Sequence, residues 1–218
     1  MSLIKELLIE SVDDTVSIEA LLRKAYLVSN KLDLNDFSEF LKKEMHGYND
    51  NDDISKIPYY RLVKGTLIVL NPISGWRPVV IEDKELEEII SSRWIMQSAF
   101  ELNSLYESKS EELSIRLSGE MNQKFSSLTG VPTTQFCISI SRASICHILN
   151  SVKTSILEWA LTLDKEGIVG DGIDFSFAEI NKANESPQVC NYINNFYSSI
   201  ESSQIQQGTK DSDIKFYR

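Results

Sequence analysis

The sequence lacks the residues from which several common functional sites are built. Its 218 residues include only two histidines and three cysteines, Cys137, Cys146 and Cys190, with no Cys-x-x-Cys pair. A zinc site therefore has few candidate ligands, and an odd number of thiols fits a reducing compartment. The nine glycines form no Gly-Lys-Ser/Thr phosphate loop and no Gly-x-Ser-x-Gly nucleophile elbow. We accordingly expect no metal and no cofactor.

Long apolar runs and an excess of positive charge are missing as well. No stretch approaches the roughly 20 apolar residues of a membrane helix, and the charged Lys5 and Glu6 come too early for a secretory signal. The 32 acidic residues outnumber the 22 basic ones, which gives a net charge of −10. Because this charge repels phosphate, neither nucleic acid nor a membrane is an expected partner. With 42% hydrophobic residues the chain can form a core, and we expect a cytoplasmic globular protein.

The N-terminal part of the chain predicts three short helices. Apolar residues recur at helical spacing over 3–8, 18–32 and 37–48, with charged residues between them. Residues 13–15 interrupt the pattern and offer capping oxygens, and Gly47 stands where a left-handed helix end is expected. Amphipathic helices joined by short connections pack against one another. We therefore expect an N-terminal three-helix unit.

From Pro58 onward the sequence favours strands. β-branched and aromatic residues cluster or alternate, and they are separated by turn residues. The predicted strands cover 59–70, 76–81, 93–99, 113–117 and 135–140. Pro78 favours a position at the edge of the sheet. Short helices are predicted over 82–91 and from Ser118 to about residue 128, whereas 102–110 fits either helix or loop.

One long helix is predicted near the end of the folded part. Ser141 is a suitable N-cap, apolar residues line one face over 142–166, and Gly167 provides the end. A further short helix capped by Ser176 follows. The predicted fold is α+β: a three-helix unit, a small mixed or antiparallel sheet, one long C-terminal core helix, and then a β-type oligomerisation tail. The predicted body covers residues 1–180.

Residues 188–218 differ in composition from the rest of the chain. Serine, asparagine and glutamine dominate, and apolar residues occur singly: Ile193, Phe196, Ile200, Ile205, Ile214 and Phe216. Such a segment cannot bury enough apolar surface alone to offset its ordering entropy. It either becomes a strand against another copy or a partner, or it is a disordered tail. We predict self-association through these six residues.

Arg142 and His147 form an Arg-x4-His pattern at the start of the predicted long helix. The pattern resembles the HEPN ribonuclease motif, in which the arginine stabilises phosphate charge and the histidine acts on the 2′-hydroxyl. Two features depart from that motif: Ala143 stands where a polar residue is usual, and strands precede the pattern. An ordinary surface position explains Arg142 equally well, and His147 needs no special role in a helix. These two residues are the catalytic candidates only in this alternative interpretation.

Several stretches together resemble the AbiTii domain family, which is associated with abortive infection and antiphage conflict systems in bacteria. The matching stretches are 3–8 with 13–17, 21–25, 41–48, 58–61, 141–144 through 157–164, and 193–196 with 203–209. The resemblance implies a cytosolic defence protein, and it assigns no catalytic residues. The last stretch is also similar to short β-tails that assemble around a symmetry axis in bacterial conflict proteins.

Two functions follow as hypotheses. The first is a non-enzymatic, self-associating module of an antiphage defence system, with the tail forming the homo-oligomer and another defence protein or a phage component as a further partner. The second is a toxin ribonuclease that uses Arg142 and His147. The acidic net charge disfavours RNA capture, so the first hypothesis is preferred.

Overall fold

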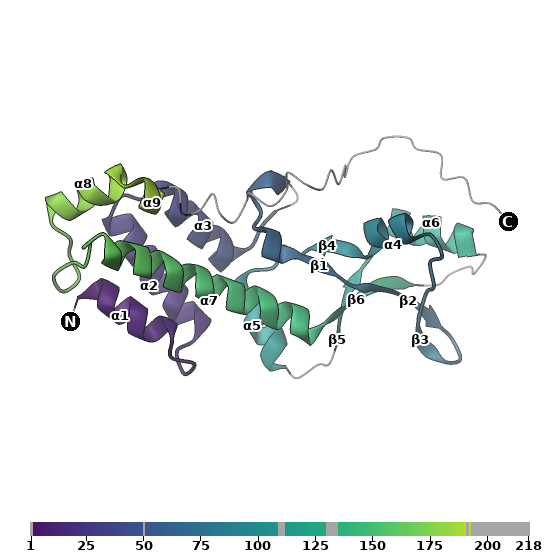
Figure 1. Cartoon of the computed structure of the whole chain (residues 1–218). Coiled ribbons are helices and arrows are strands. Elements are labelled where there is room, and N and C mark those ends of the chain that lie inside the picture. Colours follow the sequence, from purple (N-terminus) through teal and green to yellow (C-terminus); the bar gives the residue numbers. More distant parts are fainter. Residues whose placement is uncertain (1, 50, 109–111, 130–134, 191, 193–218) are drawn as a thin grey trace.

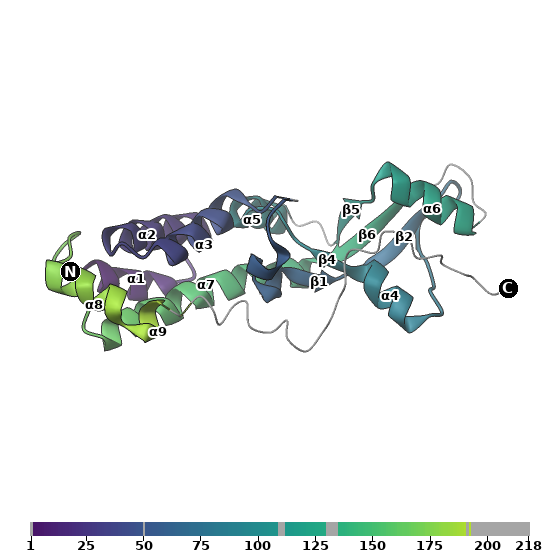
Figure 2. The same ribbon diagram turned by 90° about the horizontal axis from the view of Figure 1, so that it is seen from above.

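The computed structural model describes residues 2–49, 51–108, 112–129, 135–190 and 192. The molecule is elongated, with helices gathered at one end and a β-sheet at the other (Figures 1 and 2). One helix, α7 (Arg142–Lys165), starts at the sheet and runs along the helical end. The predicted α+β class is confirmed. The candidate residues at the start of α7 therefore lie where the two ends meet.

The three predicted N-terminal helices are present as α1 (Leu3–Ser11), α2 (Ile18–Lys31) and α3 (Asn35–His46). Ser17 caps α2 by accepting a hydrogen bond from the backbone N–H of Ala20 at 3.2 Å. Gly47 ends α3 with a φ of 86°, a conformation in the glycine-favoured region of backbone space. Helices α2 and α3 pack against each other, and both α1 and α2 contact α7. The expected three-helix unit is confirmed.

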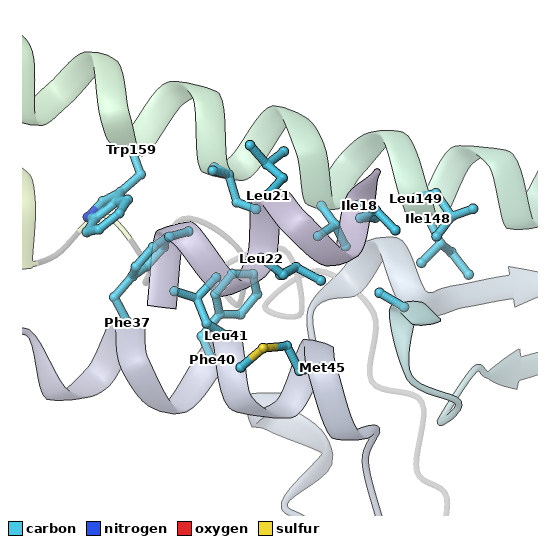
Figure 3. Packing of buried hydrophobic residues seen from close by; sticks show 14 of the residues in the cluster. Ile18, Leu21, Leu22, Phe37, Phe40, Leu41, Met45, Ile148, Leu149 and Trp159 are labelled. Carbon is cyan, nitrogen blue, oxygen red and sulfur yellow. The ribbon is translucent and has the colours of Figure 1, made fainter. Parts of the chain in front are cut away.

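The core of the helical end lies between these helices and α7. Side chains from α2, α3 and α7 point toward one another in Figure 3, and they include Leu22, Phe40 and Trp159. The rings of Phe37 and Trp159 are stacked with their centroids 4.0 Å apart. Ser141 caps α7 through the backbone N–H of Ser144, as predicted. The 24 residues of α7 make it about 36 Å long, so that it joins both ends of the molecule.

The larger sheet is antiparallel throughout. Its strand order is β3 (Gly75–Pro78), β2 (Thr66–Asn71), β6 (Phe136–Ser141), β5 (Glu112–Arg116). Helices α4 (Lys84–Ser91) and α6 (Gly119–Thr129) both lie above the sheet in Figure 1, and Figure 2 shows them apart, with the strands visible between them. The rings of Phe125 in α6 and Phe136 in β6 lie 5.5 Å apart. The prediction that Pro78 belongs to an edge strand is confirmed.

The prediction of one strand over 59–70 is wrong. This segment forms a 3₁₀ turn, η2 (Tyr59–Arg61), and then β1 (Leu62–Lys64) and β2, which belong to different sheets. The break falls at Gly65, where an added Cβ would lie 2.3 Å from Ile138 Cγ2 and 2.7 Å from the Ser139 carbonyl oxygen. Only a glycine allows the backbone to come this close to β6. At Gly65 the chain leaves the two-stranded sheet and enters the larger one.

The strand predicted over 93–99 is shorter than expected. Only β4 (Ser92–Trp94) forms, and it pairs with β1 in a separate two-stranded sheet. The strand cannot reach residue 99 because Ser98 caps α5 (Ala99–Glu107), and Glu101 completes a capping box. The segment 102–110, for which helix and loop were both predicted, is therefore helical as far as Glu107. A second 3₁₀ turn, η1 (Ile54–Lys56), lies between α3 and η2.

The described C-terminal part of the chain packs on the helical end. It comprises α8 (Phe177–Glu185), which Ser176 caps as predicted, and α9 (Pro187–Cys190). Beyond α9, the hydroxyl group of Tyr192 donates to the Ser155 carbonyl oxygen and to Glu158 Oε2, both at 3.0 Å. The division into a body of 1–180 and a tail of 188–218 stays a prediction. The packing places the root of the tail at Tyr192.

Candidate functional site

The structure places Arg142 and His147 in the first turns of α7, in different surroundings. The two positions are five residues apart in the sequence, which corresponds to about 140° around a helix. Arg142 lies over the ring of Tyr106 from α5, with its guanidinium carbon 4.3 Å from the ring centroid. His147 is exposed. The two side chains therefore leave α7 in different directions.

Arg142 is held in place by an aromatic side chain, and no ion pair with a described carboxylate accompanies this contact. Its Nε is buried and has no hydrogen-bond partner among the described residues. Stacking on Tyr106 compensates the guanidinium charge through the negative face of the ring. A hydrogen bond with Cys146 raises the pKa of Tyr106, and the charge of Arg142 opposes this shift. The phenol therefore stays protonated at neutral pH, and the arrangement joins α5 to α7.

A second cluster of charged groups lies at the junction of α3, η2 and β4, and the sequence did not reveal it. Glu44 and Arg61 are both completely buried and form an ion pair. Arg61 Nε donates to Glu44 Oε1 at 2.9 Å, and Arg61 Nη2 donates to Glu44 Oε2 at 2.5 Å. The remaining guanidinium nitrogen, Nη1, donates to the carbonyl oxygens of Ile95 and Gln97, both at 2.8 Å. The pair thus connects the helical end to the segment that follows β4.

Two tyrosines complete this cluster. The hydroxyl groups of Tyr48 and Tyr60 each donate to Glu44 Oε1 at 2.9 Å. Burial raises the pKa of Tyr60, and the negative charge of Glu44 raises it further. Burial alone lowers the pKa of Arg61, but the charge and hydrogen bonds of Glu44 outweigh burial and raise it. The raised pKa values keep Tyr60 and Arg61 in the protonation states that maintain the cluster, which suits a structural role.

The stretches that carry this cluster offered only a weak signal. Glu44, Tyr48, Tyr60 and Arg61 all fall within the segments 41–48 and 58–61. Those segments were singled out because they resemble a known family. Charged residues are mostly exposed in proteins, so composition alone does not predict a buried pair.

In a third cluster of polar groups, the loop between α7 and α8 folds around the carboxylate of Glu179. Its Oε1 accepts the backbone N–H groups of Val169 at 3.0 Å and Gly170 at 2.8 Å. Its Oε2 accepts the N–H and the hydroxyl group of Ser176 at 2.9 and 2.8 Å. Burial alone raises the pKa of Glu179, but the hydrogen bonds from Gly170, Ser176 and Val169 lower it to about 2. The ionised carboxylate therefore organises this loop.

We expect Glu179→Gln to lower the free energy of unfolding at pH 7 by about 1 kcal/mol, the usual value of a capping interaction. The folded-state pKa of about 2 lies below the ordinary value of 4.5. The stabilisation is therefore complete above pH 4.5 and is lost as the pH falls through 2. Thermal unfolding at pH 7 and pH 3 should show a gap between the two proteins that narrows in acid. Glu185→Gln in the same helix is the control, and a gap independent of pH would contradict the prediction.

Searches for other kinds of site among the described residues gave two results. No group of three or more histidine, cysteine or acidic side chains is placed to hold a metal ion there. None of the helices in the described ranges has the length and apolar character needed to cross a bilayer. The six predicted self-association residues lie outside the described residues: Ile193, Phe196, Ile200, Ile205, Ile214 and Phe216.

Comparisons with known proteins identify one family. The model of the family described as AbiTii matches residues 2–188, which covers most of the chain. No curated protein matches, and no solved structure matches. The match includes α1 to α8 and both sheets.

Proposed function

The chain belongs to the AbiTii family of abortive-infection-related proteins, and from this premise we propose that it is a non-enzymatic module that assembles through its C-terminal tail. In this proposal the body supplies the recognition surfaces of a bacterial defence system. Residues 193–218 join copies of the protein to one another. The partners are other copies of the chain, with another defence protein or a phage component as a further candidate.

The observation that carries the proposal is the placement of Arg142 and His147. Arg142 rests on Tyr106 at 4.3 Å, whereas His147 is exposed about 140° farther around α7. A ribonuclease needs both groups within reach of one phosphodiester. The net charge of −10 further disfavours RNA as a ligand. These observations support a binding role over the ribonuclease alternative.

The composition of the tail supports self-association. Its apolar residues are spaced singly among serine, asparagine and glutamine, so one copy buries little surface by itself. Several copies together can bury these residues collectively. Tyr192 fixes the point of departure, because its ring is buried and its hydroxyl group is bonded to Ser155 and Glu158 in α7. A defined root orients the tails of neighbouring copies.

We expect the full chain to form a concentration-dependent oligomer and a chain ending at Tyr192 to be monomeric. The truncation must spare Tyr192, because its two hydrogen bonds belong to the folded body. Light scattering coupled to size-exclusion chromatography measures both masses. An unchanged mass after truncation would refute the tail as the site of assembly.

Point variants distinguish the contribution of the tail's apolar side chains to assembly from the contribution of its length. Phe196→Ser combined with Ile200→Ser should reproduce the monomer, because it removes apolar surface and leaves the chain length unchanged. Ser198→Ala combined with Ser203→Ala is the matched control and should leave the oligomer intact. If His147→Ala abolishes toxicity in cells while the truncated chain stays toxic, the ribonuclease alternative is correct instead.

A further inference from the structure

Strand β5 ends the described sheet on the side opposite β3. It pairs with β6 on one side, and no described strand lies on its other side. Leu113, Ile115 and Leu117 are half-buried and pack against the main core, while Ser114 and Arg116 are exposed on the opposite face. This alternation is typical of an edge that can accept one more strand.

The two edges of the sheet differ in their capacity to recruit a strand. Strand β3 has four residues, all exposed, and it contains Pro78, which has no N–H to donate. Strand β5 contains five residues and no proline, and its apolar side chains Leu113 and Ile115 are half-buried against the core. An added strand on β5 would cover apolar surface and satisfy backbone groups together. Of the two described edges, β5 is therefore the better acceptor.

We propose that residues 213–217 from the tail of a second copy pair antiparallel with β5 as a fifth strand of the sheet. This inference rests on the proposed function and identifies the surface on which the tail docks. Ile214 and Phe216 alternate with Asp213, Lys215 and Tyr217. That period of two matches the alternation of apolar and exposed residues in β5.

Apolar pairing and charge together select one register of this pairing. When Ile214 lies opposite Ile115, Phe216 lies opposite Leu113, and Asp213 lies opposite the exposed Arg116. Opposite charges in directly paired positions stabilise a sheet. A shift of two residues in one direction would place Lys215 opposite Arg116, which is unfavourable because the charges are alike. A shift of two residues in the other direction would pair Asp211 with Arg116 and Lys215 with Glu112. However, Ser212 would then lie opposite Ile115 and Phe216 would lie beyond β5, so only one apolar pair would remain. A shift of one residue would turn Ile214 and Phe216 toward the exposed face.

The tail is long enough to reach β5. The hydroxyl group of Tyr192 contacts Ser155, and α7 covers about 21 Å from there to Ser141 at the end of β6. Arg116, paired with Cys137, lies about 14 Å farther along the strands. The extended chain from Tyr192 to Asp213 spans about 69 Å, roughly twice that path.

Exchange of tails between copies accounts for the length and the apolar residues of the segment between Tyr192 and Asp213. Within one chain, this segment would cover the short path with much slack. Its four apolar residues, Ile193, Phe196, Ile200 and Ile205, would then have no partners of their own kind. When tails cross between copies, the linking segments come together and bury these residues collectively.

Disulfide trapping between differently tagged chains tests the proposal. A full-length chain with Ser114→Cys is mixed with a full-length chain with Lys215→Cys, because these positions face each other in the proposed register. Mild oxidation should give a covalent pair that carries both tags. Arg77→Cys in β3, also on an exposed edge strand, is the matched control and should give at least tenfold less product with Lys215→Cys. Chains without an added cysteine give the background from the three natural thiols.

Charge reversal provides an independent measurement. Arg116→Asp and Asp213→Arg should each weaken association severalfold, and a chain carrying both should regain it. Equal trapping at positions 77 and 114, or no recovery in the double variant, would overturn docking on β5. In a chain that carries both Ser114→Cys and Lys215→Cys, a disulfide that forms only within that chain would overturn the exchange of tails between copies. If the protein is an oligomer but no disulfide forms between positions 114 and 215, docking on β5 is refuted and the proposed function is not. If the full chain is monomeric, the proposed function is refuted as well.

Discussion

Replacing Arg61 by alanine is expected to lower the free energy of unfolding by about 3–5 kcal/mol, because it leaves Glu44 buried without its counter-charge. Glu44 and Arg61 are each fully inaccessible to solvent. Arg61 also donates to the carbonyl oxygens of Ile95 and Gln97, which would lose their partner in the variant. Buried acceptors without a hydrogen bond add to the cost. Chemical denaturation followed by circular dichroism measures the change.

Three further variants distinguish the buried pair from simple loss of side-chain volume. Glu44→Gln should destabilise by a similar amount, because it keeps the volume and removes the charge that Arg61 needs. The double variant Glu44→Leu with Arg61→Met should regain part of the loss, since no isolated charge remains. Lys124→Ala breaks an exposed pair with Glu120 and should change stability by less than about 0.5 kcal/mol. A small effect of Arg61→Ala would mean that water reaches Glu44.

The location of this pair gives the cluster a role beyond stability. Arg61 lies directly before β1, and its carbonyl oxygen accepts the N–H of Ile95 just after β4. Glu44 belongs to α3 in the helical end. The cluster therefore fixes the two-stranded sheet β1–β4 to the helices.

The sequence predicted those elements whose pattern is local. Helical spacing of apolar residues identified α1 to α3, and the cap at Ser141 and the glycine at Gly167 placed the limits of α7 within one residue. Alternation located β5 and β6 to within one residue at either end. These signals come from side chains within a few residues of one another, so no knowledge of tertiary structure was needed.

The errors arose where a distant contact decides the conformation. Nothing near Gly65 in the sequence indicates that β6 lies too close to this position for a side chain to fit. One long strand was predicted for this reason. Arg61 was placed within that strand, although its partners are Glu44 in α3 and the carbonyl groups that follow β4. In the same way, nothing near Arg142 in the sequence indicates that Tyr106 from α5 lies beneath its guanidinium group.

Trp159→Ala is expected to destabilise the protein by about 3–5 kcal/mol, the usual cost of removing a large buried aromatic side chain. Trp159 is completely buried, and it stacks on Phe37 at 4.0 Å. Phe37 in turn contacts the ring of Tyr192, with centroids 6.2 Å apart. The cavity would therefore open between α3, α7 and the root of the tail. Thermal and denaturant unfolding measure the loss.

A phenylalanine at this position separates packing from hydrogen bonding. The indole Nε1 of Trp159 is buried and has no hydrogen-bond partner among the described residues, so Trp159→Phe removes a donor that was already costly. This variant keeps the stacking on Phe37 and should lose less than half as much stability as Trp159→Ala. Trp76→Ala, in the exposed strand β3, is the control and should cost about 1 kcal/mol or less. Equal losses for Trp159→Phe and Trp159→Ala would contradict the prediction, because they would show that the stacking on Phe37 contributes little to stability.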